Sequence, residues 1–273
     1  MPFVSLPATA TQGLSFTDRF NNAIDAVQAG IDIFWPGDFD SENINAQVGM
    51  GFGWTPDYLG SNSYRFRALP IIDIRYKDLW RISGSKISYN VFKRGIFEAG
   101  PFVNIHFGRN ERTHKALNGL GDIGTTLDLG IFARIKRESL IVELDARRAI
   151  SEGQGTAIRL TAGHGILQKG NLALAFAVRG RYMSRKGMQT NFGITERQAA
   201  NSLMGYEPFR AGAGLSEASA NLVGAYRVTE KFRVMGLMSV GHLFGDAADS
   251  PIVKGPNGSP VQTLMGLGFT MMF

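Results

Sequence analysis

The last ten residues, 264–273 (LMGLGFTMMF), alternate large apolar side chains with small ones. Met265, Leu267, Phe269, Met271 and Phe273 fall on one face of an extended strand, and Gly266, Gly268 and Thr270 on the other, with Leu264 and Met272 as exceptions. Successive side chains of a strand point to opposite faces of its sheet. Because lipid outside a barrel requires bulky apolar groups on one face only, this stretch predicts a transmembrane β-strand.

The same period of two recurs upstream. The segments that show it are 47–54, 65–76, 96–107, 126–135, 140–147, 156–167, 172–182, 218–228 and 231–243. Most of them match the roughly 9 to 11 residues that a tilted membrane strand needs. They exceed the 5 or 6 residues, about, that are typical of strands in globular proteins. The lengths therefore favour a barrel in a membrane over a soluble sandwich.

Composition excludes a helical membrane span. The mean hydropathy is −0.05, and the longest run without a polar residue or glycine is only 172–178. A membrane helix needs about 20 apolar residues in a row. The closed barrel is the other structure that satisfies its backbone in lipid. The chain has 34 glycines, which suit small inward positions, and no cysteine, which excludes disulfides and thiolate metal sites.

Links of two lengths separate the segments. Short turns are expected at 136–139, 168–171 and 229–231, and long loops at 109–121, 149–155, 183–211 and 244–260. Outer-membrane barrels have short periplasmic turns and long extracellular loops. Since the last strand would run down to the periplasm, the long loops lie outside the cell. The expected location is the outer membrane of a Gram-negative bacterium.

The number of strands does not follow directly from the pattern, because eleven segments are clear whereas bacterial barrels have an even number of strands. Segment 27–35 alternates and is the predicted twelfth strand, although 17–29 also reads as a short amphipathic helix. Segment 79–92 changes phase near Gly84, which we interpret as a bulge, with a turn as the alternative. We predict an all-β antiparallel barrel of about 12 strands over 27–273, with 10 strands as the alternative.

The first residues are assigned separately. Leu6 to Ala10 resemble the end of a signal peptide with its cleavage site, so 1–10 is read as a signal-peptide remnant. An ordinary flexible N-terminus is the alternative. Residues 11–26 are then expected to form a periplasmic N-terminal segment.

Charged residues fall on the predicted inner face. Those assigned to the lumen are Arg67, Arg75, Arg159, Arg179, Arg181, Glu143 and Asp145, joined by Arg233, Glu98 and Asp128. Buried charges must be paired, so one interpretation is a packed, salt-bridged interior. The other is a narrow pore that favours anions. The formal charge is +6, but the arginines are spread along strands, which argues against a nucleic-acid partner.

No motif predicts catalysis. Gly49 to Gly53 lacks the Lys-Ser/Thr and the helix of a phosphate loop, and no G-x-S-x-G stretch is present. The four histidines are scattered. Asp246 and Asp249 are typical of an ordered loop, with cation or lipopolysaccharide contact as the alternative. We expect no enzyme activity, no cofactor and no metal.

The terminal residues Phe269, Met271 and Phe273 resemble the signal that the barrel-assembly machinery reads, so this machinery is an expected partner. Outer-membrane lipid and lipopolysaccharide are expected to surround the barrel.

The loop motifs resemble those of the MipA/OmpV family of MltA-interacting outer-membrane proteins over about residues 46–273. The matching residues are Gly51, Gly53, Pro56, Asp57, Tyr58, Gly60, Ser61, Tyr64, Leu69, Pro70, Gly108, Arg109, Leu117, Gly119, Gly121, Asp122, Phe192, Gly193, Ile194, Gln198, Asp246, Asp249, Ser250, Pro251 and Phe273. Asn191 departs from the family, which often has an aromatic residue there. The resemblance implies a scaffold or docking protein for a murein transglycosylase and a peptidoglycan synthase. A narrow channel for small anionic solutes is the alternative function.

Overall fold

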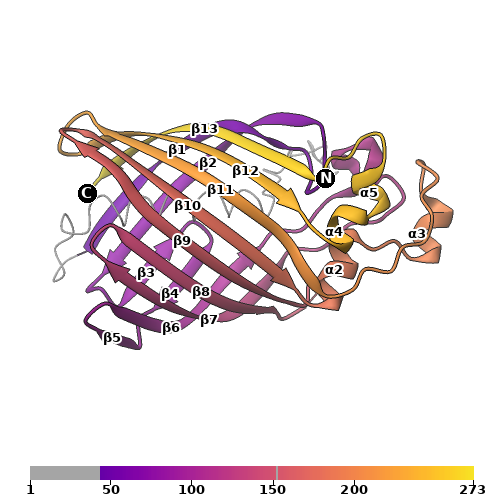
Figure 1. The fold of residues 1–273 in the computed structure, drawn as a ribbon, viewed down its shortest axis with the longest axis horizontal. Helices are drawn as coiled ribbons and strands as arrows, with labels where there is room; N and C mark the ends of the chain where they lie inside the picture. Colours follow the sequence, from indigo (N-terminus) through magenta and orange to yellow (C-terminus); the bar gives the residue numbers. More distant parts are fainter. Residues whose placement is uncertain (1–43, 152) are drawn as a thin grey trace, which may run out of the picture.

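The computed structural model describes residues 44–151 and 153–273, and these form a single β-barrel (Figure 1). The strands are β1 Ile44–Pro56, β2 Tyr64–Tyr76, β3 Trp80–Ser83, β4 Lys86–Tyr89, β5 Phe92–Arg94, β6 Phe97–His106, β7 Thr126–Arg137, β8 Leu140–Ala149, β9 Thr156–Lys169, β10 Leu172–Met183, β11 Gly214–Arg227, β12 Phe232–Leu243 and β13 Val261–Met272. The helices are η1 Glu111–Thr113, η2 Lys115–Leu117, α2 Arg185–Phe192, α3 Glu196–Asn201, α4 Asp246–Asp249 and α5 Pro251–Lys254. None of these helices is long and apolar enough to cross a membrane.

Every neighbouring pair of strands is antiparallel, and the barrel is closed because the first and last strands of the sheet pair with each other. β1 pairs with β13 from Gln47↔Met272 to Trp54↔Met265. At the other junction β4 pairs with residues 102–104 of β6, and β5 pairs with residues 97–99 of the same strand. β4 and β5 are therefore two parts of one interrupted strand, and the wall has twelve strands.

The bulge interpretation of segment 79–92 is wrong, and the turn alternative is correct. Gly84 has a φ of 56°, a left-handed conformation that glycine adopts readily, and the chain reverses there to form the β3–β4 hairpin. Ile82 and Ile87 are cross-strand partners, which explains why their odd spacing resembled a change of phase. This hairpin supplies two strands, so twelve are reached within the described part. Segments 1–10, 11–26, 17–29 and 27–35 lie outside the described residues.

Bulky apolar side chains cover the outer face of the wall. On β13 the exposed fraction is 46% for Met265, 60% for Leu267 and 43% for Phe269. Aromatic pairs lie near both ends of this band. Trp54 packs against Phe66 with ring centroids 5.1 Å apart at one end, and Trp80 packs against Tyr89 at the other. An apolar band between two aromatic girdles is the outer surface of a membrane barrel.

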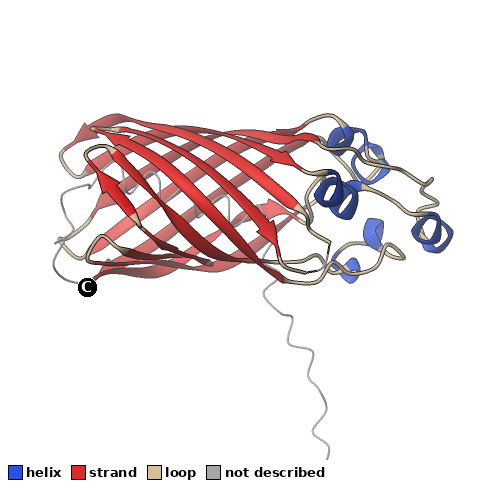
Figure 2. Cartoon of the chain, turned by 90° about the horizontal axis from the view of Figure 1, so that it is seen from below, coloured by secondary structure: helices blue, strands red, loops and turns tan. Residues whose placement is uncertain are grey.

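The two ends of the barrel differ. The turns at 138–139, 170–171 and 228–231 are short and lie at the end that carries Phe273. The helices gather at the opposite end with the long links (Figure 2). By the topology of outer-membrane barrels, the first end faces the periplasm and the second the cell exterior.

A charge on the lipid face tests the membrane assignment. Leu267 lies near the middle of β13, and we expect Leu267→Arg to lower the free energy of unfolding by about 2–4 kcal/mol. Leu203→Arg, at a loop residue that is 77% exposed, should have little effect. Urea unfolding from phosphatidylcholine vesicles measures both. Equal losses in the two variants would contradict the assignment.

Candidate functional site: the lumen and its outer cap

Ion pairs line one side of the barrel interior. Glu143 of β8 accepts hydrogen bonds from Lys86 Nζ at 3.0 Å and from Arg134 Nε at 2.7 Å. Arg134 Nη1 also lies 3.2 Å from Glu98 Oε2. These four residues come from β4, β6, β7 and β8, so their charges cross-link four neighbouring strands inside the barrel.

A second cluster lies on β6, β7, β8 and β9. Asp145 is buried between Arg147 and Arg159, each with a nitrogen 3.0 Å from one of its carboxylate oxygens. Asp128 Oδ2 lies 3.2 Å from His106 Nδ1 and 3.9 Å from an Arg147 nitrogen. Two carboxylates and two guanidinium groups therefore neutralise each other in a region where a single charge would be costly.

A third cluster centres on Asp73 of β2, which is 1% exposed. Arg75 and Arg81 both donate to its carboxylate, at 3.0 and 2.9 Å. Arg179 Nε donates to Thr161 Oγ1, and Arg181 lies 3.6 Å from Glu217. On the strands the buried charged residues are the bases Lys86, Arg147, Arg159, Arg179, Arg181 and Arg233 and the acids Asp73, Asp128, Asp145 and Glu217. The buried interior thus carries more positive than negative side chains.

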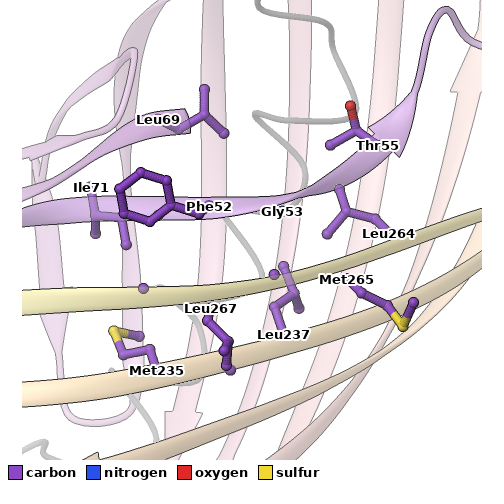
Figure 3. Close-up of a pocket in the computed structure, with 14 residues that line it drawn as sticks. Phe52, Gly53, Thr55, Leu69, Ile71, Met235, Leu237, Leu264, Met265 and Leu267 are labelled. Carbon is purple, nitrogen blue, oxygen red and sulfur yellow. The ribbon is translucent and has the colours of Figure 1, made fainter. Parts of the chain in front are cut away.

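The inner surface is apolar around the middle of β1 and β13. A hollow with a cavity volume of about 60 Å³ lies against β2, β1, β13 and β12. Figure 3 shows its side chains, among them Leu69, Ile71, Met235 and Leu237. The barrel interior therefore has an ionic wall, formed mainly by β4 and β6 to β9, and a smaller apolar wall around the middle of β1 and β13.

The long links pack into a cap over the outer mouth. One cluster of buried residues contains Tyr58, Ala116, Leu117, Leu120, Ile194, Tyr206 and Ile252. A second contains Met183, Met188, Phe192, Ala211, Leu243, Ala247 and Val253. The first cluster joins residues from four separate links, and the second joins two links to the outer ends of β10 and β12, so the cap has a hydrophobic core of its own.

Polar contacts fix the cap. Ser250 Oγ donates to the Phe192 carbonyl at 2.6 Å, and Ser250 also caps α5, which begins at Pro251. The amides of Gly119 and Gly121 both donate to Glu111 Oε2 at 2.9 Å. The Ser250 contact joins two links, and the Glu111 contacts fix the turn within the link between β6 and β7.

Titratable groups in the cap are shifted by their surroundings. Burial raises the pKa of the Tyr58 phenol above its ordinary value, and Tyr206 adds to this effect. The Tyr58 hydroxyl donates to the Asn257 carbonyl at 3.0 Å. Burial lowers the pKa of Arg109 to about 10, so this guanidinium stays charged at neutral pH. Its Nη1 donates to the Asn191 carbonyl. Both groups act as hydrogen-bond donors that hold the cap.

The loop residues of the family resemblance lie in or beside this cap, whereas Gly51, Gly53, Leu69 and Pro70 lie on β1 and β2 and Phe273 lies at the opposite end. Pro56 lies at the end of β1, Gly193 at the end of α2, Tyr58 in the first cluster and Phe192 in the second. Asp57 forms an ion pair with Arg65, and Asp249 forms one with Lys254. The remaining residues form hydrogen bonds: the Gly60 amide donates to Gln262, and Ser61 Oγ, Asp122 and Asp246 accept from the amides of Ser63, Glu111 and Gly212. Across 44–151 and 153–273, no group of three or more His, Asp or Glu side chains could hold a metal ion.

The structure also places the remaining predicted residues. Arg67, Arg75, Arg159, Arg179, Arg181, Glu143 and Asp145 all lie at inward positions of their strands. Phe269, Met271 and Phe273 lie on the outer face at the periplasmic end. Sequence reasoning missed Lys86 and Arg81 because it treated their hairpin as one strand. Recognising the turn at Gly84 would have revealed both.

The closed antiparallel barrel, its apolar outer band and its charged interior define an outer-membrane β-barrel protein of a Gram-negative bacterium. The family model described as MltA-interacting protein MipA matches residues 48–273, and the chain belongs to this family. No curated protein matches the chain.

Several solved structures are similar to the chain at low sequence identity. The NanC porin is 7% identical, with a TM-score of 0.41, and the match covers 84% of this chain and 98% of that one. The COG4313 outer membrane channel from Pseudomonas putida F1 is 10% identical, with a TM-score of 0.43 and coverage of 85% and 96%. OmpT of Vibrio cholerae is 10% identical, with a TM-score of 0.38 and coverage of 86% and 98%.

Removal of one lumen carboxylate tests the ionic wall. Asp145→Ala leaves Arg147 and Arg159 without their shared carboxylate, so we expect a loss of about 3–5 kcal/mol in the free energy of unfolding. The matched change Asp249→Ala breaks an exposed pair with Lys254 and should cost only about 0–1 kcal/mol. Urea titration in vesicles compares them. Similar losses would mean that the lumen pairs are as solvated as surface pairs.

Proposed function

We propose that this barrel is a docking protein for peptidoglycan-remodelling enzymes at the periplasmic face of the outer membrane, with no catalytic activity of its own. A murein transglycosylase and a peptidoglycan synthase are the proposed partners. The observation that carries the proposal is a basic rim at the periplasmic end. It consists of the exposed residues Lys77, Lys93, Arg94, Arg137, Lys169 and Lys231.

The rim has an excess of positive charge. Glu138 and Glu230 are the exposed acids beside it, and Asp78 is held by Lys93 at 2.8 Å. Such a ring attracts an acidic protein surface and speeds its association. Its position on short turns keeps the charges close to the membrane, where an enzyme acting on the cell wall would be held.

The rest of the molecule offers less surface for such a partner. The outer mouth is covered by packed links, and the ionic wall occupies the interior. The family description adds direct support, because it refers to interaction with MltA. We further propose that the assembly machinery recognises Phe269, Met271 and Phe273, and that lipopolysaccharide surrounds the outer half of the barrel.

Co-purification tests the docking role. We expect the full chain, solubilised from envelopes of a host with murein enzymes, to retain a transglycosylase. The variant Arg137→Glu, Lys169→Glu, Lys231→Glu reverses half of the rim and should lower recovery about tenfold or more, because the partner then meets like charges.

The matched control is Arg185→Glu, Lys186→Glu, Arg197→Glu, which makes the same charge change at exposed sites on the outer cap. It should retain the enzyme. No recovery by the native chain, or equal recovery by both variants, would refute docking through the rim.

A second candidate function is a narrow channel for small anionic solutes. The excess of buried basic side chains over carboxylates in the interior favours it. A pore lined in this way would attract anions and repel cations. Ion pairs that fill the lumen would in turn restrict its width.

Planar-bilayer recording decides this candidate. If the lumen conducts, we expect an anion-selective current whose selectivity falls in Arg179→Gln, since this residue contributes a buried positive charge on β10. Arg197→Gln, on the cap helix α3, should leave it unchanged. A silent bilayer would exclude the channel and leave the docking proposal untouched.

A further inference from the structure

A hollow lies on the lipid side of the barrel at its outer end. Its cavity volume is about 490 Å³, and its lining comes from the outer ends of β7, β8 and β9, from the link that follows β8 and from the start of α2. Figure 1 shows α2 at the ends of β9 and β10, against which it packs. The hollow belongs to neither the lumen nor the core of the cap, so it faces the surroundings of the protein.

The strand register places several lining residues in one row on the outer face. Leu129 of β7 pairs with Arg148 of β8, and Arg148 pairs with Thr156 of β9. The Thr156 carbonyl accepts a hydrogen bond from the Ser184 amide at 2.9 Å. Leu129 is 53% exposed and Arg148 is also exposed, so the row points outward.

The next row toward the membrane centre marks the edge of the apolar band. It consists of the cross-strand partners Ile131, Ala146, Ile158 and Tyr182. Tyrosine is enriched where a membrane meets water, because its ring is apolar and its hydroxyl is polar. An outward arginine is costly at the middle of the bilayer and nearly neutral close to the interface. Arg148 therefore lies at the level of the lipid head groups of the outer leaflet.

Two basic side chains bring positive charge to the hollow. Arg148 and Lys186 are both exposed, and neither forms an ion pair in the part of the chain that the structure describes. The Lys186 side chain passes Gly153, where an added Cβ would lie 3.6 Å from Lys186 Cε. In the sequence, the link that follows β8 carries one acid, Glu152, and α2 begins with a further base, Arg185. The bases around the hollow therefore outnumber the acids.

Contacts between α2 and the link fix the shape of the hollow. Thr190 Oγ1 of α2 donates to the Gly153 carbonyl at 2.8 Å. Gly155 has a φ of 69°, and a Cβ at this position would lie 2.5 Å from the Gly187 amide nitrogen. Only glycine allows α2 to pack so closely here. A site that is already ordered loses little conformational entropy when a ligand binds.

The hollow also has an apolar side. Ile150 is 61% exposed and lines the hollow together with Leu129. Contact with an acyl chain would cover both side chains, which is favourable. Arginine and lysine both bind phosphate groups. An apolar side next to two bases therefore suits an amphiphile whose head group carries phosphate.

We propose that this hollow binds the lipid A part of lipopolysaccharide, with a phosphate between Arg148 and Lys186 and an acyl chain against Leu129 and Ile150. The inference rests on the lipopolysaccharide contact proposed above and turns it into a specific site. A phosphate monoester of lipid A carries a charge of about −1.5 to −2 at pH 7, which matches two bases. The phosphodiester of a phospholipid carries a single negative charge and matches them less well.

Native mass spectrometry of the purified full chain in detergent micelles, titrated with diphosphoryl lipid A, tests the proposal. We expect saturable binding of one lipid. The variant Arg148→Gln, Lys186→Gln should weaken the affinity at least about tenfold, because the phosphate loses both cations. The matched control Arg197→Gln, Arg210→Gln removes two exposed bases of the cap that do not line the hollow, and it should bind like the native chain.

A comparison of lipids identifies the head group. The native chain should bind lipid A at least about tenfold more tightly than phosphatidylglycerol or lipid A without its phosphates, and the Arg148→Gln, Lys186→Gln variant should lose this preference. Ile150→Ser should weaken binding of both lipid A forms and keep the preference. Thermal unfolding checks that each variant is folded.

Three results would each overturn the proposal. They are equal affinity of the native chain and the Arg148→Gln, Lys186→Gln variant for lipid A, an equal loss in the control variant, and binding of phosphatidylglycerol or phosphate-free lipid A as tight as that of lipid A. The basic rim is unchanged in the Arg148→Gln, Lys186→Gln variant, so this variant should still retain the transglycosylase. The lipid site and the docking role can therefore fail independently.

Discussion

The structure depends on the requirement that backbone amides and carbonyls in hydrocarbon find partners within the protein. A sheet meets it only by closing, and here β1 pairs with β13 over eight residues from Gln47 to Trp54. Closure forces every strand to present one face to lipid and one to the interior. The outward leucines and phenylalanines and the inward glycines and arginines are both consequences of that geometry.

Closure also places charged side chains in the interior, where they are withdrawn from water and therefore require partners. On β4, β6, β7, β8 and β9 the partners are charges on other strands, such as Glu143 of β8 for Lys86 of β4 and Asp145 of β8 for Arg159 of β9. β1 and β13 avoid this requirement because glycines occupy inward positions in place of charged side chains. The ionic wall and the apolar wall therefore differ in chemistry inside one barrel, while the basic rim lies outside the lumen at the periplasmic end.

Much of the fold could be predicted from the alternation of apolar and small or polar residues along the strands. The last strand, the inward arginines and the short and long links follow from alternation, which is a local property of the chain. Which charges meet is not local. Glu143 binds Lys86, 57 residues away, through a hairpin that the sequence disguised as a bulge. The cap was missed for the same reason, since Ser250 and Phe192 are joined by a contact that neither loop reveals alone.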